Sequence, residues 1–305
     1  MAPSADAPGG VVNAMSVDVE DYFQVSAFDG VVPRSGWGNF ESRVCRNTDR
    51  LLTLFDTRHV TGTFFVLGWV AERFPGLVSR IAKMGHEVAS HGYAHRLIYD
   101  QTPEAFRDDV RRAKDLLESV TGVPVDGFRA PSYSVTARTL WALDILIEEG
   151  YRYDASIFPI RHDRYGMPDA PRHPHVLTRA GGSLLEVPPS TVRIGRINLP
   201  VAGGGYFRIL PYAWTRWGIR RINQREGRPA IFYLHPWEID PEQPRVKAGA
   251  ISRFRHYRNL DKTVGRLEQL VRDFRFSTVR HVLAASHPEP ARTSRNSQDQ
   301  AVALR

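Results

Sequence analysis

The segment SHGYAH places two histidines, His91 and His95, four residues apart. Two imidazoles at this spacing, together with a carboxylate from elsewhere in the chain, form the open three-ligand set that catalytic Zn²⁺ sites use, with water in the fourth position. Because Gly92 lies between them and a strand-like run precedes them, the pair is expected on a tight turn at the end of a strand. Taken alone, the pair favours solvated or core histidines, so its meaning depends on the residues around it.

The segments that must position these histidines alternate between strand-like and helix-like patterns. The clearest helix has a cap at Thr102, a first-turn proline at Pro103 and an end near Gly122. Strands that alternate with helices of roughly 10–15 residues predict βαβ crossovers and a parallel sheet, closed as a barrel or left open. The predicted strands are residues 11–18, 63–67, 86–90, 127–130, 151–156 and 230–234, and the other predicted helices are residues 41–57, 75–84, 136–149, 211–226 and 261–274.

Polar side chains follow almost every predicted strand, at the edge where active sites of parallel α/β sheets lie. Acids and a later histidine follow other predicted strands at the same edge. With these residues nearby, the SHGYAH pair is interpreted as part of a metal site and not as solvated or core histidines. The expected ion is Zn²⁺ or another divalent transition metal. The residues at these strand ends are Asp18, Glu20, Asp21, His91, His95, Arg129, Asp154 and His235.

The composition is that of a globular protein, with 42% apolar and 24% charged residues in a chain of 305. This excludes disorder as the main state. Residues 11–285 are predicted to form one domain, with an insertion at about 158–210 over one end of the sheet and a C-terminal extension at about 240–285. The ends, residues 1–10 and 286–305, are rich in Pro, Ser, Ala and charge and are predicted to be disordered.

The formal charge of +8 allows an acidic polymer, nucleic acid or an anionic membrane as a partner, and equally plain solubility. No nucleic-acid-binding motif is present, so no such partner is predicted. The basic segment 245–258 is either a solvated loop or, with slight preference, a clamp for an anionic glycan. Three consecutive glycines, Gly203 to Gly205, predict a tight turn, because no phosphate-loop motif follows.

The compartment is predicted from three features of the sequence. Cys45 is the single cysteine, which fits a reducing compartment. No apolar run approaches the roughly 18 residues that cross a bilayer, and the N-terminus lacks the basic and apolar regions of a secretory signal. These features predict a cytoplasmic protein without a transmembrane segment, and they leave its oligomeric state open.

Five short motifs, in chain order, resemble those of the polysaccharide deacetylase family, which has the NodB-homology or carbohydrate esterase family 4 fold. The motifs are SVDVEDYF, SHGYAH, RAPSYS, YDAS and FYLHPW, and the resemblance covers about residues 11–285. Further segments, such as GGGYFRILPY and FRHYRNLDKT, resemble the branch associated with exosortase-linked exopolysaccharide synthesis. The resemblance implies a deformed (β/α) barrel with a long insertion and a C-terminal extension.

The resemblance also implies roles around the metal. Asp18 corresponds to the general base, and His91 and His95 to the metal histidines. The sequence departs from the usual T-F-D-D-G because Val19 separates Asp18 from the next acid. This favours Glu20 as the metal carboxylate, with Asp21 as the alternative.

Further roles follow for the acid side of the site. Arg129 corresponds to the arginine that pairs with the base, and His235 to the catalytic acid. Asp154 resembles the carboxylate that orients and charges that histidine, although YDAS lacks the Trp usual in the motif. A backbone N–H near Tyr133 is expected to stabilise the oxyanion, and Trp237 is expected to contact the substrate.

These residues predict a metal-dependent hydrolase that deacetylates N-acetylated sugars in a bacterial exopolysaccharide or its precursor. Amide hydrolysis needs an activated water, stabilisation of an oxyanion and a proton for the amine leaving group. An allantoinase-like amide hydrolase on a small substrate is one alternative, which intact His91 and His95 oppose. A non-catalytic glycan-binding protein is the other, which the retained base, ligands and acid oppose.

Overall fold

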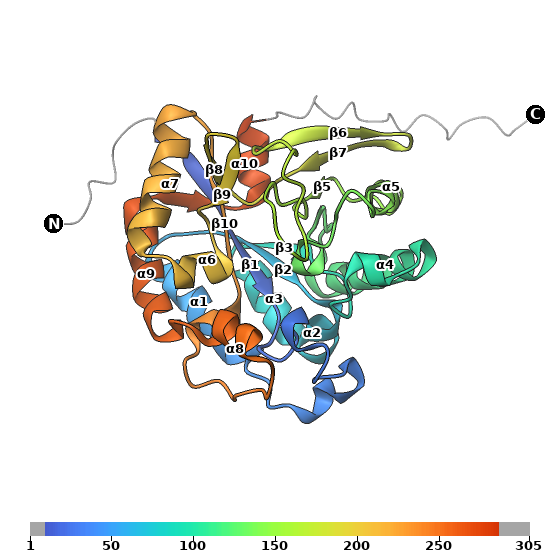
Figure 1. Cartoon of the computed structure of the whole chain (residues 1–305). Coiled ribbons are helices and arrows are strands. Elements are labelled where there is room, and N and C mark those ends of the chain that lie inside the picture. Colours follow the sequence, from blue (N-terminus) through green and yellow to red (C-terminus); the bar gives the residue numbers. More distant parts are fainter. Residues whose placement is uncertain (1–9, 287–305) are drawn as a thin grey trace, which may run out of the picture.

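Strands form the centre of the molecule and helices surround them (Figure 1). The structure, a computed structural model, describes residues 10–286, so the predicted disordered ends lie outside the described residues except for Gly10 and Ser286. The strands are β1 (Val12–Val19), β2 (Thr63–Val66), β3 (Glu87–Ser90), β4 (Gly127–Phe128), β5 (Tyr153–Asp154), β6 (His175–Arg179), β7 (Gly182–Glu186), β8 (Thr191–Ile194), β9 (Ile197–Pro200), β10 (Ile231–Leu234) and β11 (Arg275–Ser277).

The main sheet of the described residues has the order β10-β1-β2-β3-β4-β5-β7-β6, and β11 pairs with β1. Its strand pairs are parallel except for β6 and β7, which are antiparallel. The row of strands returns on itself after β7, where the N–H of Ser190 donates to the carbonyl of Ile231 in β10 at 3.2 Å. The predicted α/β class with a deformed barrel is confirmed.

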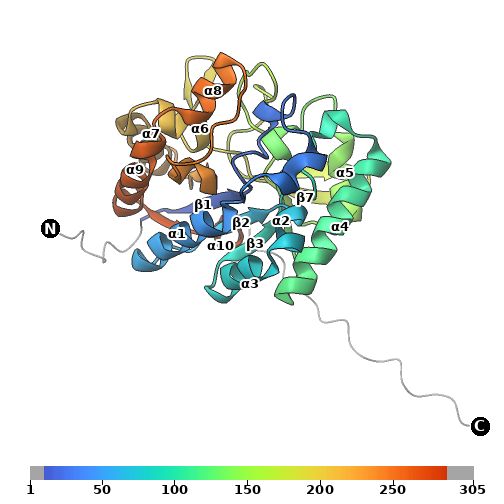
Figure 2. The ribbon, with the colours of Figure 1, turned by 90° about the horizontal axis from the view of Figure 1, so that it is seen from below.

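Helices cover the outside of the barrel, and Figure 2 shows α6 and α8 on the other side of β1 from α1 and α3. The predicted helix after Thr102 is confirmed, because the Thr102 hydroxyl accepts from the N–H of Ala105 at 3.2 Å and Gly122 ends it in the left-handed region. The helices are α1 (Val44–Thr57), α2 (Gly68–Arg73), α3 (Pro75–Lys83), α4 (Pro103–Thr121), α5 (Trp141–Glu148), α6 (Gly204–Ile209), α7 (Tyr212–Arg225), α8 (Ala250–Tyr257), α9 (Leu260–Asp273) and α10 (Val279–Ser286).

One predicted helix begins later than the sequence indicates. Residues 136–149 were expected to be helical, but α5 starts at Trp141. The Thr139 hydroxyl accepts from the N–H of Thr136 and donates to the carbonyl of Ser134, so this threonine stabilises a turn before the helix.

Apolar side chains fill two layers of the fold. The outer layer lies between the helices and the sheet and includes Val17 and Phe64, while the inner layer fills the barrel and includes Phe65, Ile231 and Val282 of α10. Alternate residues of each strand therefore face different layers, as the pleat of a strand requires. α10 packs against β1, and its Val279 N–H donates to the hydroxyl of Thr63 at the amino end of β2, so the carboxyl ends of the strands remain for a site.

The segment expected to be an insertion, residues 158–210, contributes to the barrel itself. β7 pairs in parallel with β5, and its Leu184 and Glu186 are buried, whereas β8 and β9 form a separate hairpin. The turn-forming Pro and Gly residues around β7 interrupt the strand–helix rhythm, so the local pattern did not show that this strand belongs to the sheet. The described part of the chain contains no helix that is both long and apolar enough to span a membrane.

Candidate active site and metal centre

A cavity of about 200 Å³ opens at the carboxyl ends of the strands. Asp18, Glu20, His91, His95 and His235 all line it, although they come from three different strand ends. The convergence of these side chains is what the strand-end pattern predicted. Tyr133 and Trp237 also border the cavity.

Glu20, His91 and His95 form a buried cluster in which one ligand atom of each lies within 4.8 Å of the others. Glu20 follows β1, and the two histidines follow β3 on a turn in which Gly92 has a φ of 72°. A Cβ at Gly92 would lie 2.8 Å from the Asp109 carboxylate, so only glycine fits this turn. That carboxylate accepts from the next backbone N–H, of Tyr93, at 2.7 Å and fixes the turn.

The chemistry of this cluster fits a divalent transition metal. The Nδ1 of His91 donates to the carbonyl of Arg129 at 2.8 Å, which leaves the lone pair of Nε2 free for a cation. Burial lowers the pKa of His91 to about 4, so its imidazole is neutral, as a ligand must be.

The Glu20 carboxylate supports the same conclusion. Its buried Oε2 lies 2.8 Å from the Nε2 of His95 and has no other polar partner among the described residues. Burial opposes a charge on Glu20, yet the adjacent His95 and the charge of His235 lower its pKa to about 2, so this carboxylate is ionised. One carboxylate and two imidazoles that converge in this way are a ligand set suited to Zn²⁺ and its neighbours.

Asp21, the alternative carboxylate, lies outside this cluster. Its Oδ2 accepts from the hydroxyl of Ser42 and from the N–H groups of Arg43 and Val44 at 2.6, 2.9 and 3.2 Å. Asp21 thus caps the beginning of α1, where backbone N–H groups lack partners within the helix. Glu20 is held in the site by the indole N–H of Trp237, which donates to its Oε1 at 3.1 Å.

Asp21→Ala is expected to destabilise the fold and to leave the metal in place. The N–H groups of Arg43 and Val44 would lose their acceptor, at a cost of about 1–3 kcal/mol in the free energy of unfolding. Chemical denaturation and elemental analysis of the purified variant measure the two effects. Loss of the metal with unchanged stability would instead make Asp21 the ligand.

Asp18 and Arg129 form a buried ion pair beside the cluster. Nη1 of Arg129 lies 2.6 Å from Oδ1 of Asp18 and also donates to the hydroxyl of Ser16 at 2.9 Å. Arg129 is fully buried, and its Nε donates to the carbonyl of Ala155 at 3.3 Å. The guanidinium is therefore fixed, and it directs the Asp18 carboxylate toward the cavity.

His235 faces this pair from the end of β10. Its Nε2 lies 3.8 Å from Oδ2 of Asp18 and 3.7 Å from Oε1 of Glu20, while its Nδ1 contacts Oε1 of Glu238 at 2.6 Å. Burial would lower the pKa of His235, but the hydrogen bond to Glu238 and the nearby carboxylates raise it to about 9. The ring thus favours the protonated state that a general acid requires.

The expected contact between Asp154 and His235 is wrong, because Glu238 takes that position. Asp154 accepts from the hydroxyl of Ser156 and lies beside Glu186, its partner in the β5–β7 register. Asp154 therefore has partners of its own, whereas Glu238 stands three residues after His235 on the turn Pro236–Ile239. The sequence signal for Glu238 was its position in HPWE, directly after the catalytic candidate.

The two predicted substrate-contacting residues are engaged by the protein. The N–H of Tyr133 donates to the carbonyl of Ala130 at 3.1 Å, so an oxyanion would compete with that carbonyl. Trp237 is only 6% exposed, and the rings of His235 and His256 stack against it at 5.1 and 4.1 Å. Trp237 therefore positions Glu20 and His235 and offers little surface to a sugar.

The basic segment 245–258 contains the helix α8 rather than a loop. Arg255 lines the cavity and lies 3.8 Å from Asp163, while the guanidinium of Arg245 lies 4.3 Å from the centre of the Tyr257 ring. The segment thus contributes one arginine to the cavity wall.

Two family sequence models match the chain. One, described as polysaccharide deacetylase, matches residues 35–153, which contain His91, His95 and Arg129. The other, described as a domain of unknown function (DUF3473), matches residues 155–284, which contain His235 and Glu238. Asp18 and Glu20 precede both segments.

Curated relatives match about a third of this chain. A peptidoglycan deacetylase of Helicobacter pylori is 32% identical over 108 residues, which are 35% of this chain and 36% of that protein. A peptidoglycan-N-acetylglucosamine deacetylase of Bacillus cereus is 30% identical over 98 residues, which are 32% of this chain and 36% of that protein. The chain spans little more than a third of the length of these relatives.

Solved structures match nearly the whole chain at low identity. A Mycobacterium smegmatis protein assigned to the polysaccharide deacetylases has a TM-score of 0.58 at 22% identity and covers 94% of this chain and 95% of its own. The allantoinase PuuE has a TM-score of 0.62 at 14% identity and covers 93% of this chain and 94% of its own. At such low identity these matches show a common fold.

Proposed function

We propose that this chain, which belongs to the polysaccharide deacetylase family, hydrolyses the N-acetyl amide of sugar residues in a glycan. The observation that carries the proposal is the convergence of three units in one cavity: the ion pair Asp18–Arg129, the ligand cluster, and the pair His235–Glu238. Together they supply a base, a metal site and an acid, which are the three requirements of amide hydrolysis. Relatives named as deacetylases of peptidoglycan support an N-acetylated glycan as the substrate.

Glu20, His91 and His95 are the residues that would hold the cation. When bound, a divalent cation polarises the amide carbonyl and lowers the pKa of water. Asp18 then accepts the proton of the attacking water, and Arg129 keeps the carboxylate directed at it. Because Arg129 is buried and holds Asp18 at 2.6 Å, the base is positioned before the substrate binds.

His235 completes the reaction as the C–N bond breaks. Its Nδ1–H donates to Glu238, which leaves Nε2 facing Asp18 and the cavity. Protonated at Nε2, it can give that proton to the amine leaving group, so that acetate and a free amino sugar result.

The polymer that we propose is a bacterial exopolysaccharide or its precursor, and the cation that we propose is Zn²⁺. Support for the polymer comes from the motifs that resemble the exopolysaccharide branch of the family. One wall of the cavity comes from the segment that matches the domain of unknown function, through Tyr165, Gly205, Ser252 and Arg255. If this protein selects a different polymer from other deacetylases, the residues of this wall would therefore determine that selectivity.

The proposal is tested by measuring acetate released from N-acetylglucosamine oligomers. The purified protein is assayed as prepared, after treatment with a chelator, and after Zn²⁺ is restored. We expect release that the chelator abolishes and Zn²⁺ recovers. Binding of the oligomer without release would indicate a glycan-binding protein, and hydrolysis of allantoin in its place would indicate a small-substrate amidase.

Asp18→Asn is expected to retain the metal and to lower kcat by about 10²-fold or more, the usual effect of removing a positioned general base. The asparagine keeps the shape of the side chain but does not accept a proton at neutral pH. Steady-state kinetics with elemental analysis of the same preparation measure both quantities. If Asp18→Asn lost its metal while Glu20→Gln stayed active, the two acids would have the opposite roles.

Glu238→Gln is expected to move the alkaline limb of the pH–rate profile to lower pH. His235 must be protonated to act, so activity falls as the pH rises through its pKa, which Glu238 helps to raise to about 9. Without that carboxylate the imidazole loses its proton at lower pH. Asp154→Asn serves as the comparison and is expected to leave this limb in place. If the alkaline limb moved in Asp154→Asn but not in Glu238→Gln, Asp154 would be the carboxylate that raises the pKa of His235.

A further inference from the structure

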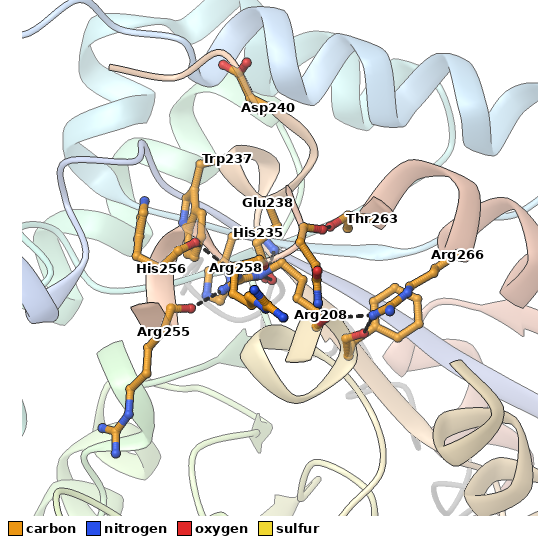
Figure 3. Close-up of polar contacts among 12 residues, drawn as sticks. Arg208, His235, Trp237, Glu238, Asp240, Arg255, His256, Arg258, Thr263 and Arg266 are labelled. Atoms are coloured by element: carbon orange, nitrogen blue, oxygen red, sulfur yellow. Dashed lines mark hydrogen bonds and ion pairs between the residues drawn. The ribbon is translucent and has the colours of Figure 1, made fainter. Parts of the chain in front are cut away.

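Glu238 connects His235 to a second buried charge, the guanidinium of Arg208, which also borders the cavity. Oε1 of Glu238 accepts from both the ring and the backbone N–H of His235, at 2.6 and 3.1 Å. Oε2 of Glu238 accepts from Nε of Arg208 at 2.5 Å, and both residues are at most 2% exposed. The carboxylate is therefore held at both oxygens, by an imidazole on one side and by a guanidinium on the other (Figure 3).

Arg208 is held in turn by the end of α8. Its Nη1 donates to the carbonyls of His256 and Arg258, both at 2.9 Å, and its Nη2 donates to the carbonyl of Arg255 at 2.8 Å. Figure 3 shows these carbonyls and Glu238 converging on the one guanidinium. A planar guanidinium can satisfy a carboxylate and several carbonyls at once, which an ammonium cannot do with the same geometry.

The position of Arg208 depends on a close approach between α6 and β10. A Cβ at Gly204 would lie 2.6 Å from the Tyr233 hydroxyl, and one at Gly203 would lie 2.2 Å from the Tyr233 carbonyl. Both glycines also have positive φ, so the tight turn predicted from the sequence is what lets α6 lie against the strand that carries His235. Arg266 fixes the other end of α6, since its Nη1 donates to the carbonyls of Phe207, Arg208 and Leu210.

The positive charges of Arg208 and His235 stabilise the ionised Glu238 carboxylate between them. Burial opposes a charge on Glu238, but Arg208 and His235 hold the pKa of this carboxyl below its ordinary value. Without Arg208, a buried carboxylate would face His235 with one oxygen unpaired, and it would favour a different rotamer or a neutral state. Either change would move or weaken the acceptor that fixes the His235 ring.

We propose that Arg208 is a positioning residue for the proposed deacetylation, and that it links the end of α8 to the catalytic His235 through Glu238. The proposal rests on the proposed function, and it assigns to residues 250–258 a role in setting the orientation of the general acid. This role accounts for the meeting of three separate parts of the chain at one point: Arg208, Glu238 and the backbone carbonyls at the end of α8.

The test compares two acetyl donors in Arg208→Met, Arg208→Lys and Glu238→Gln. On an N-acetylglucosamine oligomer, whose amine leaving group needs a proton, kcat is expected to fall by about 10- to 100-fold, part of the effect of removing an acid, with little change in KM. On 4-nitrophenyl acetate, whose leaving group needs no proton, the loss is expected to be much smaller. Arg208→Lys keeps the positive charge but lacks the planar guanidinium with its several N–H donors. Its amide activity is therefore expected to lie between those of Arg208→Met and the wild type.

A matched control is an arginine that pairs with a carboxylate next to the turn Pro236–Ile239. Arg43 pairs at 3.2 Å with the buried carboxylate of Asp240, two residues after Glu238, but has no contact with His235 among the described residues. Arg43→Met removes one partner of a buried carboxylate that Arg46 and Asn47 also contact, and it is expected to keep the wild-type ratio of amide to ester activity. Equal losses on both substrates in Arg208→Met, or an altered ratio in Arg43→Met, would overturn the positioning role.

Two further measurements separate this inference from a folding defect and from failure of the proposed function. Added methylguanidinium at a non-denaturing concentration is expected to restore amide activity in Arg208→Ala, which a misfolded variant would not show. The ¹⁵N NMR signal of the His235 Nδ1–H is expected to change in Arg208→Met but not in Arg43→Met. If the wild-type protein releases no acetate, the proposed function fails, and the NMR result alone then decides the link: an unchanged signal refutes it.

Discussion

Replacing His91 or His95 by alanine is expected to remove the bound metal and to reduce kcat by about 10³-fold or more. The reduction follows because Lewis-acid stabilisation is worth several kcal/mol and each 1.4 kcal/mol changes a rate tenfold. The two imidazoles and Glu20 are the three ligand groups of the cluster, and a site left with two of them binds a divalent ion weakly. Elemental analysis and acetate release, measured on the same preparation, give the two results together.

The control for this prediction is His281→Ala, which removes an exposed histidine of α10 far along the chain from the cluster. Both ligand variants are expected to remain folded, because the ligands lie at strand ends and not in the apolar layers, and circular dichroism checks this. Full metal occupancy in His91→Ala and His95→Ala would contradict the metal site. Loss of metal with full activity would contradict a catalytic role for it.

Replacing His235 by alanine is expected to preserve the metal and to lower kcat on the amide by about 10²–10⁴-fold, the range for loss of a positioned general acid. The imidazole faces Asp18 from the end of the neighbouring strand, with its Nε2 3.8 Å from Oδ2 of that residue. On 4-nitrophenyl acetate the loss is expected to be far smaller, because a phenolate leaves without a proton.

The ratio of the two losses distinguishes the role of His235. A general acid affects only the substrate whose leaving group needs a proton, whereas a residue that binds substrate or stabilises the fold affects both. Equal losses on amide and ester would therefore show that His235 is not the acid. Metal analysis of the same variant excludes an indirect effect through Glu20, whose Oε1 lies 3.7 Å from Nε2 of His235.

The sequence by itself predicted the parallel α/β fold and the edge of the sheet at which polar residues gather. Asp18, His91 and His235 each stand at the end of a strand-like segment, and such segments are local patterns that need no knowledge of distant contacts. Since parallel strands end at one edge, their terminal residues lie together in whatever order the strands pair. This is why the cavity could be predicted before the strand order was known.

The strand-end pattern could not decide which of two adjacent acidic residues enters the site. Glu20 and Asp21 are adjacent acids, and a shift of one position exchanges the side chain that enters the site. The structure directs Glu20 to the two histidines and Asp21 to the start of α1, because the N–H groups of Arg43 and Val44 need an acceptor there. That need arises only when α1 packs beside the end of β1.

Tertiary structure alone decided which groups support the general acid. Asp154 lies at a strand end as the predicted partner should, but its partners are Ser156 and Glu186 instead. Glu238 reaches His235 within one turn, and Arg208 reaches Glu238 across 30 residues of sequence. Buried charges need partners wherever the fold places them, so these partners depend on the packing of α6 and α8 against β10 and not on any local pattern.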